Sequence, residues 1–186
     1  MVVLLVDALG WELAGRTPDL APGLPQRRRL DTILGFSSGA LPTLFTGKLP
    51  AEHGRWLMYR RAAGSTPFAG FGWLRLAGGR VRSSWRVGRV LHALVRRRGV
   101  RGYFDLYDVP RPLLAEFDLA ERDDIFAPKG LPVDSFWDAL ARRGVSRVSW
   151  DWRTPESGNF AALERHVAEG RGARLFCYTA GLDAPL

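Results

Sequence analysis

Cysteine and long apolar runs are what this chain of 186 residues most plainly lacks. Its single cysteine, Cys177, excludes an intrachain disulfide and a metal site built from cysteines alone. Cys177 lies in the apolar run 175–178, so we expect a buried structural thiol. No run approaches the roughly 20 apolar residues of a membrane-spanning helix, and Met1–Val6 lacks the basic flank and cleavage site of a signal peptide. The sequence therefore predicts a cytoplasmic protein.

The composition is that of a globular protein with a strong positive charge. Hydrophobic residues make up 46% of the chain and charged residues 25%. The net charge is +8, and arginine far outnumbers lysine. Such a balance favours anionic partners, namely phosphate esters, anionic lipid head groups or nucleic acid. The alternative is a solvated arginine-rich surface with no partner. No motif for reading a nucleic-acid sequence is present.

Short apolar runs alternate with helix-compatible segments near both ends of the chain. Strands are expected at Val2–Val6, Leu30–Leu34, Ser146–Trp150 and Ala173–Thr179, and helices at Val133–Arg143 and Pro155–Gly170. This alternation predicts an α/β fold with a mostly parallel sheet sandwiched between helices, in one domain over residues 1–186. The first run is continuously apolar, which is typical of a strand buried on both faces.

A loop-rich insertion is expected within this domain, at residues 55–128. Its first part, Arg55–Val81, is rich in glycine and aromatic residues without a clean period, and we interpret it as a lid over the site. Ser84–Arg98 shows the spacing of an amphipathic basic helix. We expect this helix to pack on the sheet with its arginines in water; peripheral contact with a membrane is the alternative.

The chemistry is expected at residues 35–54, GFSSGALPTLFTGKLPAEHG. A strand that leads into a serine at the start of a helix surrounds the hydroxyl with free N–H groups and the positive end of the helix dipole, which favours an anion. Ser37 is the candidate nucleophile and Ser38 the near alternative. Asp7 follows the first strand and Asp183 the last, so each could lie at the same sheet edge. Asp7 could instead only cap the next helix.

Three segments together resemble the alkaline phosphatase superfamily, in particular its type I phosphodiesterase, nucleotide pyrophosphatase and sulfatase-like branch. They are VVLLVDALGW (2–11), residues 35–54 and YTAGLDAPL (178–186). The resemblance implies an alkaline phosphatase-like core and hydrolysis of phosphate mono- or diesters, or of sulfate esters. It implies that Ser37, placed at a fixed interval before Thr46-Gly47, is the nucleophile. It also implies two divalent metal ions, zinc by preference, held by Asp7, Asp183 and Ser37, with a small anionic ester as substrate.

The sequence departs from the family in its histidines. The family places further metal ligands, histidines among them, after the second aspartate, whereas His53, His92 and His166 all precede Asp183. We therefore expect an amino-terminal portion of a longer enzyme, weak or inactive by itself. His53 falls in the Pro-x-x-His-Gly turn at residues 50–54, where the family has no ligand.

Two other functions fit parts of the sequence. Gly35–Gly39 matches G-x-S-x-G, the nucleophile elbow of α/β hydrolases, and a triad of Ser37, Asp151 and His166 would complete it. That interpretation leaves Asp7, Thr46-Gly47 and Asp183 unexplained. The second alternative is a non-enzymatic basic domain that binds anionic surfaces.

Overall fold

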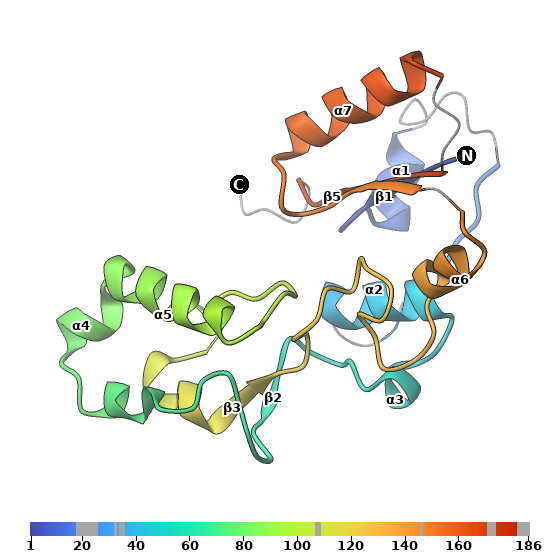
Figure 1. The fold of residues 1–186 in the computed structure, drawn as a ribbon. Helices are drawn as coiled ribbons and strands as arrows, with labels where there is room; N and C mark the ends of the chain where they lie inside the picture. Colours follow the sequence, from blue (N-terminus) through green and yellow to red (C-terminus); the bar gives the residue numbers. More distant parts are fainter. Residues whose placement is uncertain are drawn as a thin grey trace. The chain divides into compact units, whose positions relative to one another are not determined.

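The computed structural model describes residues 1–17, 26–31, 33, 36–106, 109–145, 147–170 and 174–181. The chain divides into two compact units, whose elements are labelled in Figure 1. Unit 1 comprises residues 1–32 and 140–186, and unit 2 comprises residues 33–139. The prediction of one domain over residues 1–186 stays a prediction.

Unit 1 is built on a parallel sheet of three strands in the order β1-β5-β4 (Figure 1). The strands are β1 (Val2–Val6), β4 (Arg147–Trp150) and β5 (Arg174–Thr179). β5 lies in the centre, and its residues from Leu175 to Thr179 are buried, as the unbroken apolar run predicts. The mixed α/β class with a parallel sheet is thus confirmed.

The burial expected for β1 is wrong for its first half. Val2, Val3 and Leu4 are 50%, 39% and 48% exposed. Within the described residues β1 is hydrogen-bonded to β5 alone, so its other edge has no neighbouring strand. The expected second strand does not supply one there: Leu30, Asp31 and Ile33 lie outside any strand, and residues 32 and 34 lie outside the described part.

Two helices of unit 1 follow strand ends. α1 (Trp11–Arg16) comes after the turn that follows β1, and α7 (Glu156–Ala168) connects β4 to β5. Figure 1 shows α7 running along the sheet. The buried Asn159 of α7 fixes this packing, because its side-chain amide donates to the carbonyls of Asp151 (3.0 Å) and Tyr178 (3.4 Å). The helix predicted at 155–170 is therefore confirmed, with slightly shorter bounds.

Unit 2 contains mostly short helices and strands. In chain order they are α2 (Ser37–Thr46), α3 (Pro50–His53), β2 (Tyr59–Arg61), η2 (Phe71–Arg75), α4 (Gly79–Ser83), α5 (Trp85–Arg97), η3 (Arg111–Glu116) and β3 (Phe117–Leu119). α6 (Phe136–Arg142) begins in unit 2 and crosses the boundary. β2 and β3 pair antiparallel, with Tyr59 opposite Leu119 and Arg61 opposite Phe117.

Residues 55–128, which the sequence predicts to be a loop-rich insertion, contain a hydrophobic core of their own. The buried members of this core all lie between residues 68 and 119, and they include Phe68, Leu74, Leu114 and Leu119. The helix predicted at 84–98 is confirmed as α5, and its buried residues Leu91 and Val95 belong to this cluster. The expectation that α5 packs on the parallel sheet is therefore wrong. Periodicity finds the apolar face of a helix but not what covers it.

Phe45 joins the end of α2 to the start of α6. Its ring contacts those of Phe126, Phe136 and Trp137 edge-on, with centroids 5.3, 5.4 and 5.6 Å away. α6 begins at Phe136 because the buried Asp138 accepts hydrogen bonds from the main-chain N–H and the hydroxyl of Ser135, at 2.8 and 2.6 Å. None of the helices described here combines the length and the apolar character needed to cross a membrane.

Candidate functional site

Ser37 is the first residue of α2, the ten-residue helix at the centre of the predicted site. Phe36 is the extended residue before it, and the carbonyl of Phe36 accepts from the N–H groups of Gly39 (2.8 Å) and Ala40 (3.0 Å). The N–H groups of Ser37 and Ser38 have no acceptor in the part of the chain that is described. Two free donors at the positive end of the helix dipole can meet an anion there.

Gly39 allows the start of α2 to lie close to the main chain of residues 55 and 56. A Cβ atom at this position would lie 3.1 Å from the carbonyl oxygen of Trp56 and 3.3 Å from that of Arg55. A side chain here would have to displace main-chain atoms. The glycine that follows the two serines therefore allows this close approach without a shift of the neighbouring main chain.

The Thr46-Gly47 pair closes α2. The Thr46 hydroxyl donates to the carbonyl of Pro42 (2.7 Å) and accepts from the N–H of Lys48 (3.1 Å). Gly47 has φ +67°, a left-handed conformation that glycine adopts at little cost, and its N–H caps the carbonyl of Thr43 at 2.8 Å. The interval from Ser37 to Thr46 is thus the full length of one helix.

His53 is a structural residue of the turn that follows. Its side chain is 0% exposed at the end of α3. Nδ1 accepts from the main-chain N–H of Arg55 (3.1 Å), so Nε2 carries the proton that it donates to the hydroxyl of Thr43 (2.9 Å). Burial lowers the pKa of His53, and the nearby charge of Arg55 lowers it further. Because both ring nitrogens are engaged, His53 ties α3 to α2 and is not placed as a metal ligand.

Asp7, in unit 1, lies directly after β1 and is half-buried. Its Oδ2 accepts from the hydroxyl of Tyr178 (2.6 Å) and its Oδ1 from the N–H of Ala8 (2.9 Å). Ala8 has φ +58°, so the chain turns sharply after the carboxylate. Tyr178 was missed in the sequence, because only the strand register, with Leu5 opposite Tyr178, brings it beside Asp7.

Asp183 lies outside the described residues. β5, the strand that precedes it, is the hydrogen-bonded neighbour of β1, with Thr179 opposite Val6. The carboxyl ends of these parallel strands therefore meet at one sheet edge, which is the edge where Asp7 lies. Ser37 belongs to unit 2, whereas Asp7 belongs to unit 1.

Two further carboxylates lie near the same strand ends of unit 1. Asp151 follows β4 and pairs with the guanidinium and the main-chain N–H of Arg153. Glu156 reaches the end of β5, since a Cβ atom at Gly181 would lie 2.1 Å from its Oε2. Burial raises the pKa of Cys177, and the charge of Glu156 raises it further. Cys177 is fully buried, which confirms the expected structural thiol.

The described residues do not by themselves fit a metal centre. Among them, no group of three or more histidine, cysteine, aspartate or glutamate side chains is arranged to hold a metal ion. Asp7 supplies one carboxylate whose oxygens each retain a further acceptor site. Any metal site at this edge would need Asp183, or ligands beyond the described part of the chain.

The triad of the alternative hydrolase finds no support in the local geometry. A nucleophile elbow holds its serine in a sharp, strained turn, whereas Ser37 is a helical residue and is not among the non-glycine residues with positive φ, Ala8 and Lys129. Asp151 bonds to Arg153. His166 packs edge-on against Trp150, with ring centroids 6.0 Å apart.

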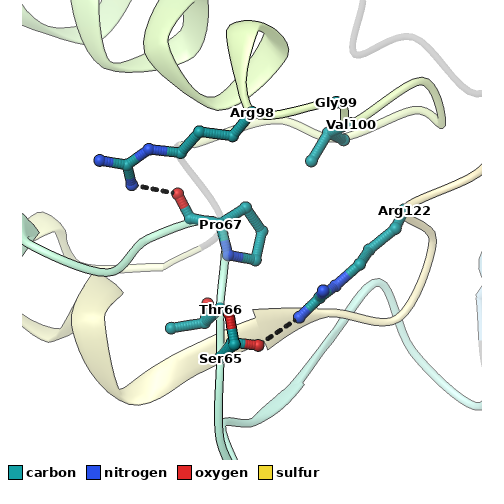
Figure 2. Close-up of a pocket in the computed structure, with 7 residues that line it drawn as sticks. All are labelled: Ser65, Thr66, Pro67, Arg98, Gly99, Val100 and Arg122. Carbon is teal, nitrogen blue, oxygen red and sulfur yellow. Dashed lines mark hydrogen bonds between the residues drawn. The ribbon is translucent and has the colours of Figure 1, made fainter.

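A small cavity of about 130 Å³ lies in unit 2, between Arg98 and Arg122 (Figure 2). Both guanidinium groups are already bonded within the chain. Arg98 donates to the carbonyls of Pro67 (2.6 Å) and Ala69 (2.7 Å), and Arg122 donates to that of Ser65 (2.6 Å). The walls of this cavity therefore serve the fold of unit 2, and none of the predicted site residues lines it.

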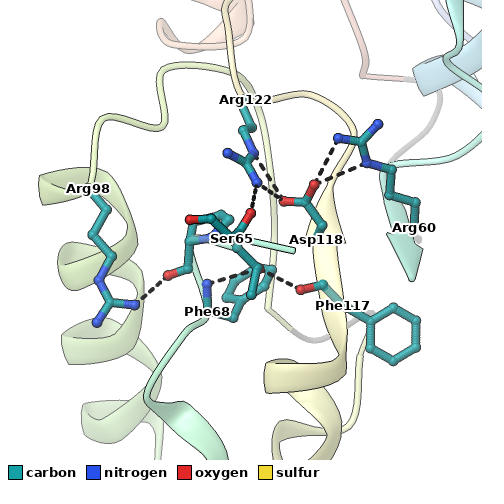
Figure 3. Close-up of polar contacts among 9 residues, drawn as sticks. Arg60, Ser65, Phe68, Arg98, Phe117, Asp118 and Arg122 are labelled. Atoms are coloured by element: carbon teal, nitrogen blue, oxygen red, sulfur yellow. Dashed lines mark hydrogen bonds and ion pairs between the residues drawn. The ribbon is translucent and has the colours of Figure 1, made fainter. Parts of the chain in front are cut away.

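Asp118 organises the charged groups beside this cavity (Figure 3). Its side chain is 6% exposed and pairs with Arg60 (2.9 Å) on one oxygen and with Arg122 (2.6 Å) on the other. The Thr66 hydroxyl donates to the carbonyl of Phe117 at 2.6 Å. These contacts tie residues 60–68 to β3.

No protein-family model matches this chain, and no match was found among curated proteins or among solved structures. The case for a function therefore rests on the motifs quoted above and on the geometry around them.

Proposed function

We propose that this chain hydrolyses phosphate mono- or diesters, with sulfate esters as the alternative substrate class, through nucleophilic attack by Ser37. We further propose that its parallel sheet is part of an alkaline phosphatase-like core. One observation carries the proposal. The interval between Ser37 and Thr46-Gly47, which the family motif fixes, is the length of helix α2, so the motif positions a hydroxyl at the start of that helix.

The start of α2 suits an anionic ester. The substrate's phosphoryl oxygens would accept from the N–H groups of Ser37 and Ser38, where the helix dipole is also favourable. The Ser37 Oγ–P bond would form as the bond from phosphorus to the leaving alcohol breaks, and that alcohol would take a proton. Water would then cleave the bond between phosphorus and Ser37 Oγ, which releases inorganic phosphate when the substrate is a monoester and a phosphate monoester when it is a diester.

Ser37 is favoured over Ser38 as the nucleophile. The Ser38 Oγ is buried and has no hydrogen-bond partner among the described residues. A hydroxyl without access to solvent cannot meet a substrate in this conformation. Leaving this hydroxyl unpaired lowers the stability of the fold, at a point next to the close approach of the main chain at Gly39.

Metal dependence is the part of the proposal that comes from the family resemblance. Bound divalent ions would lower the pKa of the serine hydroxyl and neutralise charge on the transferring group. Asp7 is the described residue proposed as a ligand, and Asp183 is proposed with it. Isothermal titration of Zn²⁺ into the chain and into Asp7→Asn tests this part separately, because it requires no turnover. Equal affinity in the two proteins would remove Asp7 from the ligand set.

The reaction is tested with the full chain and 4-nitrophenyl phosphate, bis(4-nitrophenyl) phosphate and 4-nitrophenyl sulfate, with Zn²⁺ or chelator. Acid-quenched samples are digested, and mass spectrometry locates any phosphoryl group, so that weak turnover does not hide the intermediate. We expect the modification on Ser37, its loss in Ser37→Ala and its retention in the matched variant Ser38→Ala. A phosphoryl group that persists in Ser37→Ala would refute the assignment.

The serine esterase alternative gives the opposite pattern. It predicts hydrolysis of 4-nitrophenyl acetate that survives chelator, together with labelling of Ser37 by a fluorophosphonate. The non-enzymatic alternative predicts neither modification.

A further inference from the structure

The charge of this chain is segregated along its sequence. Residues 53–104 contain twelve of its 27 basic residues and none of its 19 acidic ones. The remainder of the chain is net negative, although the whole chain carries +8. The positive charge therefore belongs to one stretch of unit 2 rather than to the surface in general.

Many arginines of unit 2 are occupied by the fold itself. Arg60 and Arg122 pair with Asp118, Arg75 with Glu116 and Arg101 with Asp123, while Arg96, Arg98 and Arg111 donate to main-chain carbonyls. Figure 3 shows Arg60 and Arg122 on the two oxygens of Asp118. Their number alone would therefore overstate the charge available to a partner.

The five arginines of α4 and the outer side of α5 are different. Arg80, Arg82, Arg86, Arg89 and Arg97 are exposed, and no side-chain hydrogen bond or ion pair of theirs exists within the described residues. On α5, Arg86, Arg89 and Arg97 follow one another at spacings that place them along one side, opposite the buried Leu91 and Val95. α4 and α5 are consecutive helices of unit 2 (Figure 1).

Large apolar side chains that neighbour these arginines in the sequence are also exposed. Trp85 is 62% exposed, Val90 58%, Val81 39% and Leu76, just before α4, 93%. The Trp85 ring lies beneath the guanidinium groups of Arg86 (5.8 Å) and Arg89 (5.4 Å). We call these five arginines with Leu76, Val81, Trp85 and Val90 the basic apolar face.

We propose that the basic apolar face docks on an anionic phospholipid bilayer. Lipid phosphates would pair with the five free guanidinium groups, while the indole and the aliphatic side chains enter the head-group region, where tryptophan is favoured. Nucleic acid would satisfy the arginines but would leave Leu76 and Val90 in water. The combination of free charge with exposed aliphatic groups favours lipid. Neither Ser37 nor Asp7 takes part in this contact.

The expected strength follows from the number of free charges. Each arginine near an anionic bilayer contributes about 1 kcal/mol, or roughly 5-fold in the partition coefficient. Removing two should weaken binding by about 30-fold at low salt, and raising the salt should weaken it in the unaltered chain. Removing an exposed aliphatic group should cost a further factor of about 5 on lipid alone.

The test is co-sedimentation of the full chain with vesicles of phosphatidylcholine, with and without phosphatidylglycerol as the anionic lipid. A parallel titration uses a DNA duplex. The variants are Arg86→Gln/Arg89→Gln and Leu76→Ser/Val90→Ser. Arg28→Gln/Arg29→Gln, an exposed pair in unit 1, is the control that removes equal charge. All replaced side chains are exposed, and circular dichroism checks that each variant is folded.

We expect the unaltered chain to bind anionic vesicles only. The affinity for these vesicles should fall about 30-fold in Arg86→Gln/Arg89→Gln and at most about 2-fold in the control Arg28→Gln/Arg29→Gln. The Leu76/Val90 variant should weaken vesicle binding and leave DNA binding unchanged. Equal loss in the control pair would overturn the proposal, because the effect would then be net charge. Binding to DNA without binding to vesicles would also overturn it and would assign this face to nucleic acid.

Discussion

Replacing His53 by alanine tests the structural role assigned to the turn after α2. The imidazole is 0% exposed and makes two hydrogen bonds, to Thr43 Oγ1 at 2.9 Å and from the N–H of Arg55 at 3.1 Å. If these bonds hold α3 and the following turn against α2, their loss must appear as a loss of stability of unit 2. If His53 were instead a metal ligand, stability without metal would change little.

The magnitude can be worked from these contacts. Each buried group left without a partner costs about 1 kcal/mol or more, and the space left by a deleted buried ring adds a cavity term of similar size. His53→Ala should therefore lower the free energy of unfolding by about 3 kcal/mol. His166→Ala is the matched control, because His166 is half-buried and its Nε2 has no partner within the described residues. We expect a loss of about 1 kcal/mol there.

The assay is urea unfolding in the presence of chelator at pH 7.5, followed by tryptophan fluorescence and far-ultraviolet circular dichroism. A loss in His53→Ala no larger than that in His166→Ala would refute the structural role. A loss that appears only when Zn²⁺ is present would point to metal ligation instead.

The same variant carries a pH prediction. Burial, with Arg55, lowers the pKa of His53 in the folded state below the value of about 6.5 expected in the unfolded chain. The unfolded state therefore binds a proton more readily, and stability present above pH ~6.5 should be lost as the pH falls through the folded-state pKa. Between pH 7.5 and 5.5 the unfolding free energy should fall less in His53→Ala than in the unaltered chain. Equal slopes of the unfolding free energy against pH in the two proteins would contradict this assignment.

Two further substitutions test unit 2. Asp118→Ala removes the partner of Arg60 and Arg122, whose side chains are 60% and 40% exposed and can be rehydrated. We therefore expect the free energy of unfolding, measured with urea, to fall by about 2 kcal/mol rather than by the roughly 3–5 kcal/mol typical of fully buried pairs. A fall below about 0.5 kcal/mol would show that the ion pairs are not structural. Gly39→Ala places a methyl group 3.1 Å from the carbonyl oxygen of Trp56, which should cost about 1–2 kcal/mol. Gly72→Ala, with nothing within 4 Å of its Cβ, is the control, and equal losses at the two positions would argue against a close approach at Gly39.

Local pattern was sufficient for the central strand of the parallel sheet and for the long helix of unit 2. A continuous apolar run predicts β5, and helical spacing of apolar residues predicts α5. The structure has both elements within about one residue of the predicted bounds. The reason is that burial on two faces and burial on one stripe each impose a period on the sequence. His53 was expected in a turn, and it is the last residue of α3, directly before Gly54.

The candidate site was predictable only in part. The helix that begins at Ser37 and ends at Thr46-Gly47 could be read from the motif. The hydrogen bond from Tyr178 to Asp7 could not, because it depends on the pairing of strands separated by more than a hundred residues. That Ser37, Asp7 and Asp183 come together in one site stays a prediction.

By itself, the sequence determined the strands β1, β4 and β5, the helices α5, α6 and α7, the chain's excess of arginine and the residue types gathered at residues 35–54. Only the tertiary structure decided that residues 68–119 enclose a core of their own, that β1 leaves Val2, Val3 and Leu4 exposed, and which arginines are free. The physical reason is the range of the interactions. Backbone propensity and apolar period act within a few residues, whereas ion pairs such as that of Arg60 with Asp118 join groups far apart in the chain, which only packing brings together.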